Sequence, residues 1–236
     1  MGFLQGNLIE FPLPQHFDPQ KLLTDLDTAD TFHFSAHPLQ HHDGSWSVIN
    51  LIYAGGKQDY AHEGTFGYGT EEPQATEVLA HCPYFREVLA AFPTKVKMAR
   101  LSALPPGGRI LRHHDPIESI DFGVLRVHVP IRNDPRQVAF KLGFKRRYWQ
   151  CGQAYYGDFT FPHSVHNTAN FNRVNLIADL EMNDAMLAFF PPGYMSEKTK
   201  YWRAWLRTQE RNISWHLGRW ENRLHLRGAA AKDPGY

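Results

Sequence analysis

The sequence predicts a mainly β fold, a sandwich, jelly roll or barrel, with helices before and after it. The chief observation is a series of short β-rich runs between about residues 94 and 182, separated by Pro, Gly, Asn and Asp. Helical periodicity occurs only on either side of this series. We therefore expect N-terminal strands and supporting helices of the same domain over residues 1–93, a β core over 94–182, and a helical extension over 183–236.

The N-terminal part predicts two short helices and a strand. In "FDPQKLLTDL", Asp18 and Pro19 are typical of an N-cap and a first helical position, and the leucines lie on one face. The run "WSVINLIYAGG" predicts a strand that ends at a glycine pair. Residues 83–92 place apolar side chains at intervals of three and four, which predicts the second helix.

The C-terminal part predicts one long helix or two broken helices after a Pro-Pro-Gly break, with Ser196 as the N-cap. We expect its apolar stripe to pack on the β core or on a second subunit, as a homodimer contact, and its basic face to be solvated. A lid over the active site is a third role that the pattern leaves open. The stripe comprises Trp202, Leu206, Ile213, Leu217, Trp220 and Leu224, and the basic face comprises Lys198, Lys200, Arg203, Arg207, Arg211, Arg219 and Arg223.

Composition favours a globular protein with a small or neutral partner. The formal net charge of +1 supplies no broad field for nucleic acid or an anionic membrane, so neither is expected as a partner. The 2 cysteines are too few for a disulfide framework, which fits a reducing compartment. With neither a signal-peptide pattern nor an apolar run of membrane-spanning length, a cytoplasmic location is expected.

A His-X-Asp pattern at His113 and Asp115 is the strongest candidate for a metal site. Residues two apart in a strand point to the same side, so both side chains could reach one ion. His163, in a later run, would add a third ligand, with His166 as a rival. Two histidines and one carboxylate leave open positions on the ion, as in non-haem Fe(II) oxygenases.

The same letters occur earlier in the chain, in "HPLQHHDGSW". There His41, His42 and Asp43 sit between Pro38 and Gly44 in a turn-rich stretch. We interpret these three as solvent-exposed loop residues. Any later pair of a His and an Arg that could complete a site with them lies at a spacing that fits the second triplet better.

Several polar side chains are expected to face the same interior. In "RVNLIADL", aliphatic residues alternate with a set that begins at Arg173, whose buried guanidinium would need an anion such as a dicarboxylic cosubstrate. In "VLRVHVPI", Arg126 and His128 share one side of a strand. Ser102 could hydrogen-bond a carboxylate, although a lone inward Ser or His is more often a satisfied core group.

From about Lys95 to Met182 the chain resembles the aspartyl/asparaginyl β-hydroxylase family of Fe(II)/2-oxoglutarate dioxygenases, including its bacterial branch of free-amino-acid hydroxylases such as the proline hydroxylases. The matching runs, in the family's order, are "ARLSALPPGGRILRHHD", "LRVHVPI", "WQCG" with "GDF", "FPHSVHN" and "RVNLIADL".

This resemblance implies a double-stranded β-helix, a cupin-like jelly roll braced by helices. It also implies Fe(II) and 2-oxoglutarate as cofactors, O₂ as cosubstrate, and hydroxylation of an unactivated C–H with release of succinate and CO₂. The implied iron ligands are His113, Asp115 and His163, and the implied cosubstrate residues are Arg173, Ser102, His128 and Arg126.

Two departures from the family favour a small amino-acid-type substrate. The animal enzymes that act on protein domains have Gly where this chain has Asp115. They also have an Arg, for an aspartyl side chain, where this chain has Val124. Candidate substrate contacts are Arg126, Glu118, which could meet an amine, and His166 with Asn167, which could line the pocket.

Three alternatives remain at this point. The substrate could be an aspartyl, asparaginyl or other residue tethered to a peptide or carrier protein docked on the basic C-terminal face. The chain could instead be a β-sandwich metal- or ligand-binding protein without oxygenase activity, or a dioxygenase that modifies nucleic acid, against which the near-neutral charge argues.

Overall fold

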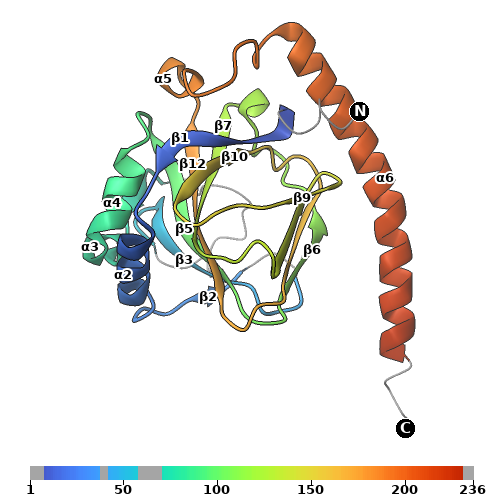
Figure 1. The fold of residues 1–236 in the computed structure, drawn as a ribbon, viewed down its shortest axis with the longest axis horizontal. Coiled ribbons are helices and arrows are strands. Elements are labelled where there is room, and N and C mark those ends of the chain that lie inside the picture. The colour runs from blue at the N-terminus through green and yellow to red at the C-terminus, as the bar shows by residue number, and fades with distance from the viewer. Residues whose placement is uncertain (1–7, 38–41, 58–70, 231–236) are drawn as a thin grey trace.

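Two antiparallel sheets pack face to face and form a double-stranded β-helix (Figure 1). The computed structural model describes residues 8–37, 42–57 and 71–230, with side chains up to residue 216. Between the sheets lies an apolar cluster to which both contribute, for example Val48 and Leu104 from one sheet and Phe140 and Val165 from the other. The predicted mainly β, jelly-roll fold is therefore confirmed.

The larger sheet has eight strands and includes the N-terminal ones. Strands from residues 1–93 thus extend the same sheet as strands from residues 94–182. In spatial order its strands are β1 (Glu10–His16), β10 (Gln153–Gly157), β7 (Val124–Arg132), β12 (Arg173–Glu181), β5 (Val96–Leu104), β3 (Ser47–Ala54) and β2 (Ser35–Ala36), with β4 (Pro73–Ala75) also paired to β3.

The smaller sheet has four strands and carries two of the three expected metal ligands. A 3₁₀ turn, η1 (Ile120–Phe122), follows its first strand and precedes β7. In spatial order the strands are β6 (Arg109–His113), β11 (His163–Asn167), β8 (Val138–Leu142) and β9 (Lys145–Arg147).

Three helices cover the outer face of the larger sheet: α2 (Pro19–Ala29), α3 (Glu77–His81) and α4 (Pro83–Ala90) (Figure 1). The helix predicted from Asp18 begins as expected, since the Asp18 side chain accepts a hydrogen bond from Gln20 N at 2.8 Å. The aliphatic residues of β12 pack against these helices in one large cluster. The alternate residues of β12 therefore face the space between the sheets.

The C-terminal part forms a short helix, α5 (Asp184–Leu187), and one long helix, α6 (Glu197–Ala230). Ser196 accepts a hydrogen bond from Thr199 N at 3.3 Å, as expected of the N-cap. Helix α6 lies on the opposite side of the β core from α2–α4 (Figure 1). In the described part of the chain, no helix is both long and apolar enough to span a membrane.

Among the described side chains of α6, part of the expected basic face is buried, and part of the expected apolar stripe does not pack on the β core. Arg203 and Arg207 are 0% and 7% exposed, whereas Trp202 and Ile213 are 46% and 48% exposed. The reason is that the two guanidinium groups form ion pairs with Asp121 and with a buried carboxylate of the β core. Leu206 does pack against the cluster between the sheets. The side chains of Leu217, Trp220, Leu224, Arg219 and Arg223 lie outside the described residues.

Candidate metal centre and its surroundings

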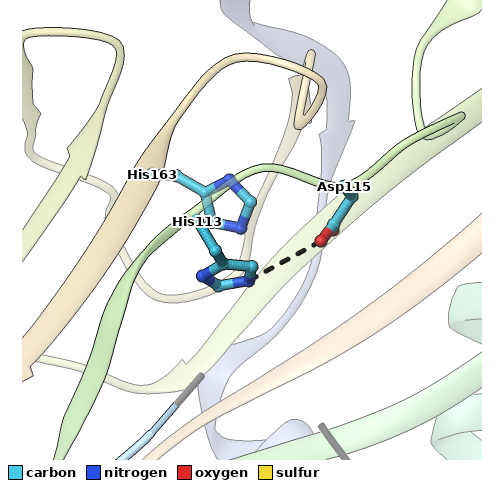
Figure 2. A group of neighbouring side chains, drawn as sticks. All are labelled: His113, Asp115 and His163. Carbon is cyan, nitrogen blue, oxygen red and sulfur yellow. Dashed lines mark ion pairs between the residues drawn. The ribbon is translucent and has the colours of Figure 1, made fainter. Parts of the chain in front are cut away.

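His113, Asp115 and His163 come together at one end of the smaller sheet (Figure 2). One potential ligand atom from each lies within 4.8 Å of the others. His113 at the end of β6 pairs directly with His163 at the start of β11, with ring centroids 4.2 Å apart. This is the only group of three or more His, Cys, Asp or Glu side chains that could hold a metal in the described part of the chain.

Asp115 reaches the group from a loop and not from the strand. The sequence pattern placed His113 and Asp115 on one side of a continuous strand, but β6 ends at His113. The main-chain N of Asp115 instead donates to Phe159 O at 2.9 Å, which fixes the loop against the segment that leads to His163. His113 Nε2 and Asp115 Oδ1 are then 3.6 Å apart.

Main-chain carbonyls orient both histidines. His113 Nδ1 is 2.7 Å from Leu111 O, and His163 Nδ1 is 3.1 Å from Phe161 O. A carbonyl oxygen only accepts, so Nδ1 carries the proton in both rings and Nε2 is the nitrogen that could bind a metal. Burial, followed by the charge of His113, lowers the pKa of His163 to about 3, so its ring is neutral and able to bind a metal at neutral pH.

Arg126 on β7 supports the carboxylate of Asp115. Its Nη1 donates to Asp115 Oδ2, while its Nε and Nη2 donate to the two oxygens of Asp179 at 2.6 and 2.7 Å. Burial alone would raise the pKa of Asp115, but the charges of Arg126 and then of His163 and His113 lower it to about 2. Arg126 therefore keeps Asp115 ionised, with Oδ1 facing His113.

Glu118 lies beside the same guanidinium. Its Oε1 is 3.4 Å from Arg126 Nη2, and its side chain is 13% exposed. Burial, which outweighs the attraction of Arg126, raises the pKa of Glu118. The sequence placed Arg126 near the cosubstrate or substrate; the structure places it among three carboxylates, those of Asp115, Glu118 and Asp179.

Arg173 lies between the sheets, as the alternation of β12 predicted, and is 4% exposed. It forms no ion pair with any carboxylate in the part of the chain that the structure describes. Burial lowers its pKa to about 10, so the side chain remains a cation at neutral pH. It lines a pocket whose other walls include Pro130, Val138, Phe140, Trp149 and Asn175.

Asn175 connects Arg173 with His128. With its oxygen turned toward them, the Asn175 amide accepts from Arg173 Nη2 at 2.6 Å and from His128 Nδ1 at 3.2 Å. His128 Nε2 is buried and has no hydrogen-bond partner among the described residues. Burial, then the charge of Arg173, lowers the pKa of His128 well below its usual range. A buried cation beside an unsatisfied polar atom is typical of a ligand site.

Ser102 lies next to this group on β5, in register with Asn175. Its hydroxyl accepts a hydrogen bond from Trp46 Nε1 at 2.8 Å. The sequence interpretation placed Asn175 and Asp179 on the Arg173 side of the β12 alternation but gave neither residue a role. It also missed Trp46, which no local pattern marks.

His166 and Asn167 occupy different faces of β11. His166 alternates with His163 and lies on the other side of the strand from the metal group. Asn167 is fully buried, and its Nδ2 donates to Leu104 O at 2.9 Å and Phe171 O at 2.8 Å. The Asn167 amide therefore binds main-chain carbonyls. Neither His166 nor Asn167 directs a polar group toward His113, Asp115 and His163.

The first His-His-Asp triplet does not gather a metal group among the described residues. Asp43 is exposed and accepts from Arg109 N at 2.9 Å and Ser45 N at 3.1 Å, so it closes a turn as expected. His42 differs from the expectation, because it is only half-exposed and packs edge-on against Trp46. His41 lies outside the described residues.

Comparison with known proteins gives one family match. The family model for aspartyl/asparaginyl β-hydroxylase matches residues 19–183. This range contains all of the site residues described in this subsection. A search of curated protein sequences found no match.

Three of the solved structures that the chain is similar to are the following. An oxidoreductase of the 2OG-Fe(II) oxygenase family from Burkholderia pseudomallei is 14% identical, over 73% of this chain and 85% of that one, with a TM-score of 0.49. HygX from Streptomyces hygroscopicus, with nickel and 2-oxoglutarate bound, is 8% identical over 75% and 84%, with a TM-score of 0.48. A Pseudomonas putida prolyl-4-hydroxylase is 12% identical over 74% and 92%, with a TM-score of 0.43.

Proposed function

Because the chain belongs to the aspartyl/asparaginyl β-hydroxylase family of Fe(II)- and 2-oxoglutarate-dependent dioxygenases, we propose that it hydroxylates an unactivated C–H of a free amino acid or an amino-acid-derived small molecule. The observation that carries this proposal is the pairing of two sites between the sheets. One is the His113, Asp115 and His163 group, and the other is the buried guanidinium of Arg173.

The three side chains suit Fe(II). Two imidazoles with oriented Nδ1 atoms and one ionised carboxylate are the donors that non-haem Fe(II) uses, and together these three side chains would hold the ion. When bound, Fe(II) with 2-oxoglutarate and O₂ supplies the oxidant that hydroxylates the substrate, with release of succinate and CO₂. The protein's contribution is to hold, orient and desolvate the reactants.

The pocket at Arg173 suits the distal carboxylate of 2-oxoglutarate. A planar guanidinium can hold a carboxylate through two parallel hydrogen bonds. Asn175 fixes the Arg173 plane from one side, and Ser102 lies in the adjacent register position on β5. The walls formed by Val138, Phe140 and Trp149 are apolar, and apolar surroundings strengthen such a charge pairing.

We assign recognition of the substrate amine to Glu118. Arg126 is already paired with Asp115 and Asp179, so it is poorly placed to bind a substrate carboxylate. Glu118, in contrast, makes one long contact with Arg126, at 3.4 Å through Oε1, accepts from Ile117 N at 3.0 Å through Oε2, and remains partly exposed. A carboxylate in this position beside the metal group would pair with an ammonium group.

The interpretation with a carrier-tethered substrate loses part of its support. It relied on a basic docking face along the C-terminal helix, but Arg203 and Arg207 of that face are buried in ion pairs. Lys198 remains exposed. A small amino-acid-type substrate therefore accounts better for the charges on the described surface.

Aerobic turnover of 2-oxoglutarate across a panel of free amino acids tests the proposal. Succinate formed with Fe(II) and ascorbate should increase with at least one amino acid, and this increase should disappear in His163→Ala and His113→Ala. His166→Ala, on the opposite face of the same strand, and Asp43→Ala, in the first triplet, are matched controls that should keep it. Retained binding of Fe(II) and 2-oxoglutarate without stimulation by any free amino acid would instead favour a tethered substrate. Loss of both binding events would favour the non-enzymatic alternative.

A further inference from the structure

A buried ionic network joins helix α6 to the core of the molecule. Arg207 Nη2 lies 2.9 Å from Asp158 Oδ2 and 3.1 Å from Asp121 Oδ2. Arg203 donates to both oxygens of Asp121, through Nε at 3.1 Å and through Nη2. Two cations thus meet two carboxylates, and the Arg203 and Asp158 side chains are 0% exposed.

The two carboxylates belong to the segments that carry the metal ligands. Asp121 lies in η1, in the segment that follows Asp115, and Asp158 lies in the segment that precedes His163. Arg207 therefore bridges the chain after one ligand and the chain before another. Burial favours neutral Asp121, but the hydrogen bonds and charges of Arg203 and Arg207 outweigh it and hold the Asp121 pKa below its usual range.

These two segments are also bonded directly to each other beside the metal group. Asp115 N donates to Phe159 O at 2.9 Å, and Phe159 N donates to Glu118 O at 3.1 Å. Ser119 Oγ donates to Asp158 Oδ2 at 3.0 Å. A shift of either segment would therefore move the Asp115 main chain and Glu118 together.

A second contact from α6 acts on the same region. Arg211 Nε donates to Thr160 O at 3.3 Å, one residue before Phe161, whose carbonyl orients His163. Helix α6 thus places three successive arginines of one face, Arg203, Arg207 and Arg211, against the ligand-bearing segments. It also lies outside residues 19–183, which the family model matches.

We propose that α6 is a positioning element of the metal centre, and that Arg207 is its principal positioning residue. By holding Asp121 and Asp158 together, Arg207 sets the separation of the two segments and hence the convergence of Asp115 and His163. Outer contacts of this kind typically change metal affinity by about 10- to 100-fold when they are removed. The proposal rests on the metal site assigned above, but not on the identity of the substrate.

Anaerobic titration of the whole 236-residue chain with Fe(II) tests this role. Tryptophan fluorescence can follow the titration, since the rings of Trp46 and His113 are 6.5 Å apart. Arg207→Met should raise the Fe(II) dissociation constant roughly 10-fold or more, and should speed hydrogen exchange of residues 115–122 and 158–163. Lys198→Met, an exposed cation on the same helix, should change neither quantity. Arg207→Lys should recover part of the affinity.

The outcomes separate this proposal from the proposed function. If the wild type turns over no amino acid but Fe(II) affinity still depends on Arg207, the substrate assignment fails and the positioning role stands. If folded Arg207→Met binds Fe(II) as tightly as the wild type and exchanges at the same rate, the positioning role is wrong, whatever the melting temperature does. If Arg207→Met does not fold, Asp121→Asn is used in the same titration, with the same expected loss and the same contrary result.

Discussion

Arg126 and Arg173 are both buried guanidinium groups on the inner face of the larger sheet, but their surroundings differ in charge. Burial disfavours the Arg126 cation, yet Asp179, Asp115 and Glu118 outweigh it and raise the Arg126 pKa well above its usual value. Arg173 has only neutral neighbours in its described hydrogen bonds, and burial lowers its pKa. The charge of Arg126 is therefore neutralised by carboxylates of the protein itself, whereas Arg173 is suited to bind an anionic ligand.

Replacement of Arg173 should separate ligand binding from stability. Arg173→Met removes charge-assisted hydrogen bonds worth about 1.5–3 kcal/mol, so the KM for 2-oxoglutarate should rise by about 10- to 100-fold. The free energy of unfolding without ligand should stay the same or increase, because a buried cation without a counter-ion is lost. Arg173→Lys keeps the charge but not the fork and should lose less. Steady-state kinetics and urea denaturation measure the two effects, and an unchanged KM in Arg173→Met would contradict the assignment.

Glu118→Gln tests recognition of the substrate amine. Loss of a charged hydrogen bond should raise the KM of the preferred amino acid by about 10-fold or more, with little change in Fe(II) affinity, since Glu118 is not among the three converging ligands. An analogue in which hydrogen replaces the amine should be an equally poor substrate for both proteins. If wild type and Glu118→Gln discriminate between the two substrates to the same extent, another group binds the amine.

At the scale of the element, strand β12 explains how far the sequence could be interpreted. Its period of two assigns Val174, Leu176 and Ala178 to the helix-covered face and Arg173 to the interior, and the structure confirms both. Local periodicity suffices here because both faces of the strand are buried and differ in polarity. The same rule did not predict the position of Asp115, because the strand ends two residues before it and long-range hydrogen bonds then set its direction.

Substitutions on the two faces of β12 should have different consequences. Leu176→Ala leaves a cavity in the cluster under the helices and should lower the free energy of unfolding by about 2–5 kcal/mol, with an unchanged dissociation constant for 2-oxoglutarate. Asn175→Ala, one residue earlier, should weaken 2-oxoglutarate binding, because Arg173 loses the hydrogen bond that orients it. Urea denaturation and calorimetric titration provide the comparison. Weakened ligand binding in a folded Leu176→Ala protein would show that the two faces are not independent.

Helix α6 shows where sequence periodicity fails. Its charged residues predicted a solvated face because charge usually marks the outside of a helix. The carboxylates that overturn this expectation, Asp121 and Asp158, are separated from Arg207 by 86 and 49 residues. Only the folded chain brings them together. The exposed face carries Tyr201, Trp202, Trp205, Ile213 and Trp215 instead.

At the scale of the whole molecule, the candidate site joins the two sheets. His113 and His163 belong to the smaller sheet, and Asp115 follows it directly. Arg126 and Asp179 are register partners on neighbouring strands of the larger sheet. The contact of Arg126 with Asp115 therefore ties the two sheets together at the metal group. The sequence pattern selected all three residues of the group that converges in the structure, but it could not predict this connection, which depends on how the sheets face each other.

Asp179→Asn should consequently affect both stability and metal binding. Asp179 is fully buried and holds Arg126 through two hydrogen bonds, so the substitution leaves that guanidinium with one fewer buried counter-charge. Breaking such a pair typically costs about 3–5 kcal/mol of unfolding free energy. Because Arg126 also orients Asp115, Fe(II) affinity should fall by about 10-fold or more.

Asp27→Asn, whose side chain is 75% exposed, is the matched control for Asp179→Asn and should change neither the stability nor the Fe(II) affinity. Urea denaturation without metal and anaerobic Fe(II) titration measure the two effects separately. A protein that loses stability but binds Fe(II) as tightly as the wild type would show that Asp115 is held by its own loop, and not by the larger sheet.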